Sequence, residues 1–160
     1  MKNVTLYLIL IALSLSCTSN ISEPILIEIE EDFSSIENPK ERWEAYNLED
    51  YYIEQKWACE CSQPYGAEIF VKENKVLDVN FSNHTLEGRQ TNFDGAFSRI
   101  TTINEAFQLI DEYQSRADSI FVEYSPKYGY PTRLIIDKSF VIADEEIRYN
   151  FRGLKKIIQF

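Results

Sequence analysis

Six segments in which apolar and polar residues alternate place the strongest constraint on the fold of this chain. Alternation puts every second side chain on one face of an extended strand, so each segment is expected to be a strand with one packed face. Short turns, such as the polar pair Glu73-Asn74, cannot join parallel neighbours, which predicts an antiparallel sheet. The predicted strands are residues 51–61, 67–72, 76–81, 119–124, 132–137 and 145–151.

Two helix starts interrupt this series of strands. Asn38 followed by Pro39 combines a capping side chain with a proline at the first helical position, and predicts a short helix to about residue 47. Thr102 and Glu105 form a capping box ahead of apolar residues at helical spacing, which predicts a second helix to about residue 115. The predicted fold is therefore α+β, with an antiparallel sheet in the order αβββαβββ and both helices packed on one face.

The N-terminus carries a secretory signal. Lys2 precedes an apolar run over residues 4–15 that is too short to span a bilayer, and small residues lead up to Cys17. This pattern is typical of a bacterial lipoprotein in which residues 1–16 are removed and Cys17 is lipidated; a signal cut elsewhere and a buried helix are the alternatives. The expected location is the bacterial cell envelope, at the outer membrane, with membrane contact through the lipid anchor.

The remainder is expected to form an acidic tether over residues 17–38 and a single α+β domain over residues 39–160. The tether is rich in acids, Ser and Asn, as in a spacer. Residues 25–30, however, alternate like a short strand and could pair with an edge of the sheet instead. Both interpretations stay open at this point.

The charge of the chain limits its partners. The chain has 16 Lys and Arg against 26 Asp and Glu, a formal net charge of −10, and loss of Lys2 with the signal brings the balance to −11. An acidic protein is repelled by phosphate backbones, so we do not expect nucleic acid as a partner. Basic proteins or divalent cations fit better, although the charge also simply keeps a tethered protein soluble.

Two cysteines form the first candidate site. Once Cys17 is lipidated, Cys59 and Cys61 remain as a pair in an oxidising compartment, which favours a disulfide. Residues two apart in a strand have β-carbons beyond the roughly 4 Å that a disulfide needs, so the bond would require a bend. A local staple, a redox-active dithiol, a metal site and free thiols are the four interpretations; zinc would need about two more ligands, and His84 is the chain's single imidazole.

Two further groups are candidate sites. A loop rich in tyrosine, glycine and proline is either a rigid binding surface or a packed connector, with Tyr124, Tyr128, Tyr130 and Pro131 as its candidate residues. Carboxylates at the two ends of one connection could converge on calcium or bond to the backbone, with Asp137, Asp144 and Glu145 as candidates. No other cofactor is predicted.

The sequence lacks a nucleophile elbow, a phosphate loop and paired metal-binding histidines, which favours a protein that is not an enzyme.

Several of these motifs resemble the bacterial lipoproteins of domain of unknown function 6174. The most specific are Cys59-Glu60-Cys61 and residues 124–132, Tyr-Ser-Pro-Lys-Tyr-Gly-Tyr-Pro-Thr, and the similarity extends over residues 43–151. The resemblance implies an envelope lipoprotein without an established activity, so it supplies no catalytic residues.

The expected function is a non-catalytic module that binds an envelope protein or another envelope component through its sheet face or aromatic loop. The alternative is a redox-active or metal-responsive protein that uses Cys59 and Cys61. A third hypothesis is a structural module stabilised by calcium.

Overall fold

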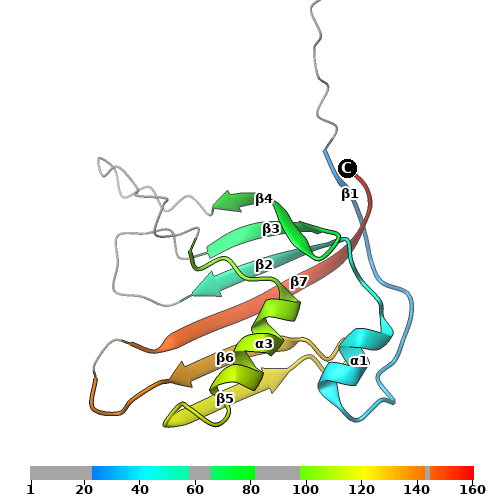
Figure 1. Cartoon of the computed structure of the whole chain (residues 1–160). Coiled ribbons are helices and arrows are strands. Elements are labelled where there is room, and N and C mark those ends of the chain that lie inside the picture. Colours follow the sequence, from blue (N-terminus) through cyan, green and yellow to red (C-terminus); the bar gives the residue numbers. More distant parts are fainter. Residues whose placement is uncertain (1–22, 58–65, 82–97, 143–144) are drawn as a thin grey trace, which may run out of the picture.

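The computed structural model of the chain describes residues 23–57, 66–81, 98–142 and 145–160. The strands of this part pair antiparallel into one seven-stranded sheet in the order β4-β3-β2-β7-β6-β5, with β1 also on β7 (Figure 1). The α+β class is therefore confirmed. The elements are β1 (Ile25–Ile27), α1 (Pro39–Ala45), β2 (Tyr51–Trp57), β3 (Gly66–Lys72), β4 (Lys75–Phe81), α3 (Ile103–Tyr113), β5 (Ser119–Tyr124), β6 (Pro131–Asp137) and β7 (Ile147–Gln159).

The order of elements differs from the predicted αβββαβββ by one strand at its start. β1 pairs with the C-terminal end of β7, with Ile25 opposite Gln159 and Ile27 opposite Lys156. Of the two interpretations of residues 25–30, the structure thus shows a strand over Ile25–Ile27. Ile29 is only 2% exposed and belongs to the core. The segment expected to be an acidic tether therefore includes residues that pack on the domain.

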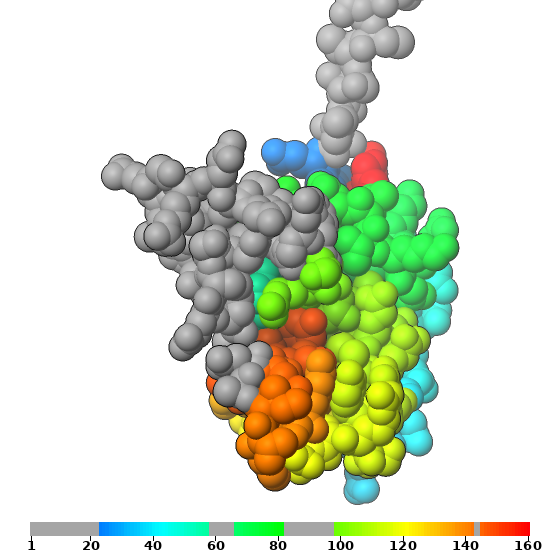
Figure 2. All heavy atoms as spheres, turned by 60° about the vertical axis from the view of Figure 1, so that its left-hand side comes forward, coloured from blue at the N-terminus to red at the C-terminus, as the bar shows by residue number. Residues whose placement is uncertain are grey.

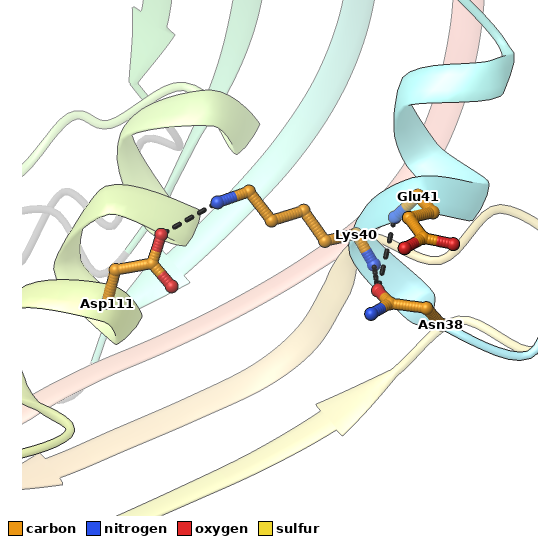
Figure 3. Close-up of polar contacts among 4 residues, drawn as sticks. All are labelled: Asn38, Lys40, Glu41 and Asp111. Atoms are coloured by element: carbon orange, nitrogen blue, oxygen red, sulfur yellow. Dashed lines mark hydrogen bonds and ion pairs between the residues drawn. The ribbon is translucent and has the colours of Figure 1, made fainter.

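The short helix α1 begins at the predicted cap. The Asn38 Oδ1 atom accepts hydrogen bonds from the backbone N–H groups of Lys40, at 2.9 Å, and Glu41, at 3.2 Å (Figure 3). Pro39 takes the first helical position, where its missing N–H leaves no bond unmade. The Lys40 ammonium then reaches across to α3 and pairs with the Asp111 carboxylate at 2.7 Å (Figure 3). The two helices are therefore joined by an exposed ion pair.

The second helix begins with the predicted capping box. The Glu105 N–H donates to the Thr102 hydroxyl at 3.2 Å, and the Thr102 N–H donates to the Glu105 carboxylate at 2.7 Å. α3 contacts β6, which it crosses in Figure 1, and its residues Ile103, Ala106, Phe107 and Ile110 are buried in the core. The local cap thus sets where the helix starts, and burial of these residues holds it in place.

The main core contains side chains from α1, α3 and the sheet. It combines Trp43 of α1 and Ile103, Ala106, Phe107 and Ile110 of α3 with strand residues that include Tyr51, Ile53, Ile69, Leu134 and Ile136. Gln55 is one of the buried polar residues: its side chain accepts a hydrogen bond from the Thr101 N–H at 3.0 Å and donates one to the Arg99 carbonyl at 2.6 Å. Tyr52, Phe70 and Ile157 form a second, smaller cluster separate from the main core, and Leu26 and Phe160 pack against it.

β7 continues well beyond the end at residue 151 that alternation predicted. Its pairing with β2 shifts register between Tyr52 and Glu54, which face Lys155 and Arg152, so β7 holds one extra residue there. Gly153 lies in this bulge with a φ of +69°. The extra residue lets Phe151 and Leu154, three positions apart, both join the main core. Because the bulge interrupts the alternation of apolar and polar residues, the sequence pattern did not predict the part of β7 that follows residue 151.

Two glycines with positive φ differ in what surrounds them, which yields a prediction. A β-carbon at Gly129 (φ +81°) would overlap the Pro39 carbonyl oxygen, whereas one at Gly153 would meet only the end of the Glu54 side chain, at 3.2 Å. We expect Gly153→Ala to lower the free energy of unfolding by about 1–2 kcal/mol and Gly129→Ala by about 3 kcal/mol or more. Urea denaturation of both variants measures the difference, and equal losses would contradict the close approach at Gly129.

Candidate functional site

The aromatic loop between β5 and β6 is packed into the domain. Tyr130 is 5% exposed, and Pro131 is fully buried. The Tyr128 ring stacks on Tyr130 with centroids 6.2 Å apart and meets Tyr46 edge-on at 5.3 Å, while Tyr124 stacks on a helix side chain. Burial raises the pKa of the Tyr130 hydroxyl to about 12. Tyr130 and Pro131 are thus buried, and Tyr124 and Tyr128 are partly buried against other rings, which favours the packed connector over the binding surface.

Arg42 of α1 holds this loop in place. Its guanidinium donates to the carbonyl oxygens of Pro126, at 2.6 Å, and Ser125, at 3.3 Å, and its Nε donates to the Ile36 carbonyl at 2.7 Å. One side chain therefore joins the N-terminal segment, α1 and the β5–β6 loop. Sequence reasoning missed Arg42 because its partners are backbone carbonyls, which leave no signature in the residue types.

The junction at Arg42 gives a second prediction. Lysine keeps the charge, but its ammonium group cannot donate to the Ile36 and Pro126 carbonyls at the same time as the planar guanidinium does. Arg42→Lys should therefore lower the free energy of unfolding by about 2 kcal/mol. The matched control is Arg116→Lys. Arg116 forms an exposed pair with Glu112 at 2.6 Å, and its replacement should change stability by less than about 0.5 kcal/mol. Thermal and urea unfolding measure both; similar losses for the two variants would argue against the junction.

The other predicted site residues are described only in part. Asp137 and Glu145 lie at opposite ends of the β6–β7 connection, and the buried Glu145 Oε1 atom has no hydrogen-bond partner among the described residues. In the part of the chain that the structure covers, no three His, Cys, Asp or Glu side chains are grouped to hold a metal ion. The calcium hypothesis stays a prediction. Cys17, Cys59, Cys61, His84 and Asp144 lie outside the described residues.

The largest apolar exposure among the described residues is at the β6–β7 tip, defined here as residues 139–142. Phe140 is 70% exposed, Val141 90% and Ile142 57%. The tip has a defined backbone, since the Ile142 N–H donates to the Ser139 carbonyl at 3.1 Å and the Phe140 N–H donates to the Asp118 carboxylate at 2.8 Å. Three consecutive apolar side chains are thus exposed in the β6–β7 connection, which belongs to the region coloured orange in Figure 2.

A shallow hollow of about 230 Å³ lies between β6 and β7. Its lining is Arg133, Leu134, Ile135, Arg148, Tyr149 and Asn150. The Arg133 guanidinium stands 5.5 Å from the centroid of the Phe121 ring, and Arg148 pairs with Glu146 at 3.1 Å. The tip thus offers exposed apolar side chains, and the hollow is lined by two guanidinium groups.

Residues 35–156 match the model of a family of unknown function, DUF6174. The chain belongs to this family. The match confirms the family that the sequence suggested, and it extends past both ends of the predicted range, residues 43–151. No curated protein and no solved structure matches the chain.

The tip and the hollow both lie within the stretch matched by DUF6174. The candidate surface therefore belongs to the family's domain and not to the segment that precedes it. None of the described helices is long and apolar enough to cross a membrane.

Proposed function

We propose that this DUF6174 protein is a non-catalytic, lipid-anchored protein of the bacterial envelope that binds another envelope protein through the β6–β7 tip. Three consecutive apolar side chains at this tip, exposed by 57 to 90%, carry the proposal. Such a run lowers solubility without stabilising the fold, and exposed apolar surface of this kind is typical of interaction sites. Arg133 and Arg148, which line the hollow between β6 and β7, would suit acidic groups of such a partner.

The position of the tip relative to the N-terminus supports this role. β1 pairs with residues 156–159 of β7, whereas the tip precedes Ile147 at the other end of the same strand. At about 3.3 Å per residue, this length of strand separates the two ends by roughly 35 Å. Figure 1 shows β1 and the β6–β7 connection at opposite ends of the molecule. A chain attached to a membrane by its N-terminus would therefore present the tip away from its own anchor.

Photo-crosslinking in cells tests the tip. A photoreactive amino acid in place of Val141 should give a crosslink to a protein, because this side chain is 90% exposed at the proposed contact. The matched control is Leu77 of β4, which is 54% exposed at the far border of the sheet and should give no such crosslink. Replacing Phe140 and Ile142 by serine should weaken the Val141 crosslink at least tenfold, since the anchoring side chains dominate such contacts.

Two outcomes would overturn the binding role of the tip. Crosslinks of equal strength from Val141 and Leu77 would show unspecific contact. Crosslinks from Val141 to lipid alone would show that the tip contacts a membrane and not a protein.

The lipid anchor and the envelope location rest on the sequence around Cys17. The full chain should partition into the detergent phase of a cloud-point extraction and fractionate with the outer membrane, because acyl chains bury many methylenes at about 0.8 kcal/mol each. The Cys17→Ser variant should move to the aqueous phase or stay uncleaved. Detergent partition that is unchanged in a cleaved Cys17→Ser protein would exclude Cys17 as the lipidated residue.

The redox or metal-responsive alternative rests on Cys59 and Cys61 in the sequence, and the calcium hypothesis rests on Asp137, Asp144 and Glu145. No contact among the described residues favours either one over the binding role.

A further inference from the structure

The two borders of the sheet differ in how they are protected against pairing with another strand. In the described part of the chain, β4 forms one border and β5 the other. β4 starts with Lys75 and shifts register against β3, where Phe70 faces Asp78 but Val71 faces Val76, so Leu77 is an extra residue in a bulge. Lysines and bulges are the usual features that prevent one edge strand from adding to another.

β5 has neither of these protective features. Its residues face those of β6 in regular register from Ser119 opposite Asp137 to Glu123 opposite Arg133. The register shift that follows places the extra residue, Thr132, in β6 and leaves β5 straight. The strand Ser-Ile-Phe-Val-Glu-Tyr contains no lysine and no proline. Since β5 pairs with β6 alone among the described strands, its outer backbone groups form a regular template for another strand.

We propose that β5 pairs antiparallel with β5 of a second copy of this chain, which joins the two sheets into one. Residues directly opposite each other in a sheet point to the same face. In a two-fold symmetric antiparallel pair of identical strands, this condition is met only if one residue lies opposite the same residue of the other copy. Centring the pair on Phe121 matches residues 119–123 of the two copies, with Ile120 opposite Val122 and Ser119 opposite Glu123. This register matches apolar with apolar residues and puts no like charges opposite each other.

Phe121 supplies the side-chain contact at the centre of this pair. It is 47% exposed although it lies in the middle of a strand, and the Arg133 guanidinium stands 5.5 Å from its ring centroid. In the proposed register the Phe121 rings of the two copies meet across the junction, each with its own Arg133 beside it. Directly opposed aromatic residues are among the stabilising cross-strand pairs, which gives the exposed ring a partner.

A junction formed by one short strand from each copy is small. Stable interfaces bury about 1,200 Å² or more, so we expect a dimer that dissociates on dilution. Copies confined to one membrane surface would have a raised local concentration. Only this last consequence depends on the proposed lipid anchor.

Cysteine crosslinking of the full chain in cells tests the pair and its register. In a background with Cys59→Ser and Cys61→Ser, Phe121→Cys should give at least tenfold more disulfide-linked dimer than Leu77→Cys, a residue exposed by 54% on the other border. Ser119→Cys alone should stay monomeric because it faces Glu123 of the other copy. The double variant Ser119→Cys with Glu123→Cys should crosslink, and peptide mapping should find the bond between positions 119 and 123.

A charge placed at the centre of the strand provides the second test. Phe121→Lys puts like charges opposite each other and should lower crosslinking of the Ser119→Cys, Glu123→Cys variant at least tenfold, while Leu77→Lys should leave it unchanged. Circular dichroism of each variant verifies that it is folded.

Three results would overturn the proposal: no excess of dimer for Phe121→Cys over Leu77→Cys, equal crosslinking by Ser119→Cys alone, or disulfides from Phe121→Cys to a different protein. Failure of the β6–β7 tip as a binding surface is distinguishable from these results. Val141→Ser should leave the Phe121→Cys dimer unchanged.

Discussion

The sheet depends on β7, because this strand joins parts that otherwise do not pair. β2, β3 and β4 form one antiparallel group and β5 and β6 another, and among the described strands the two groups are hydrogen-bonded into one sheet only through β7. The bulge at Gly153 lets one strand serve both packed clusters, since Phe151 and Leu154 enter the main core while Ile157 joins the smaller one. A break in the pairing of β7 would therefore divide the sheet and disturb both clusters at the same time.

The Arg42 junction explains how a helix of seven residues keeps its place. Helices this short are marginal in water, so α1 relies on tertiary contacts. Burial of Trp43, the Arg42 bonds to two segments and the Lys40 pair with Asp111 supply them. The β5–β6 loop is thereby held on α1, and β5 reaches the border of the sheet as a strand fixed at its C-terminal end.

Features set by neighbouring residues were predictable from the sequence. The caps at Asn38 and Thr102 are local, and the Glu73-Asn74 turn has the positive φ angles, +49° and +60°, that a tight hairpin needs. Features set by distant contacts were not. The second half of β7 follows a bulge that only pairing with β2 reveals, and exposed Val141 looks in the sequence like any buried apolar residue. Which edge of β5 is free depends on the order of strands, which alternation does not specify.

The placement of β1 has a mechanical consequence. β1 lies antiparallel to the end of β7 that is farthest from the β6–β7 tip, with Ile25 opposite Gln159. A pulling force between the N-terminal segment and the tip would run along the strands, at right angles to the hydrogen bonds that join them. The bonds between β1 and β7 would then resist together as a sheared group instead of opening one after another. Tension along the length of the domain would therefore load these hydrogen bonds in parallel.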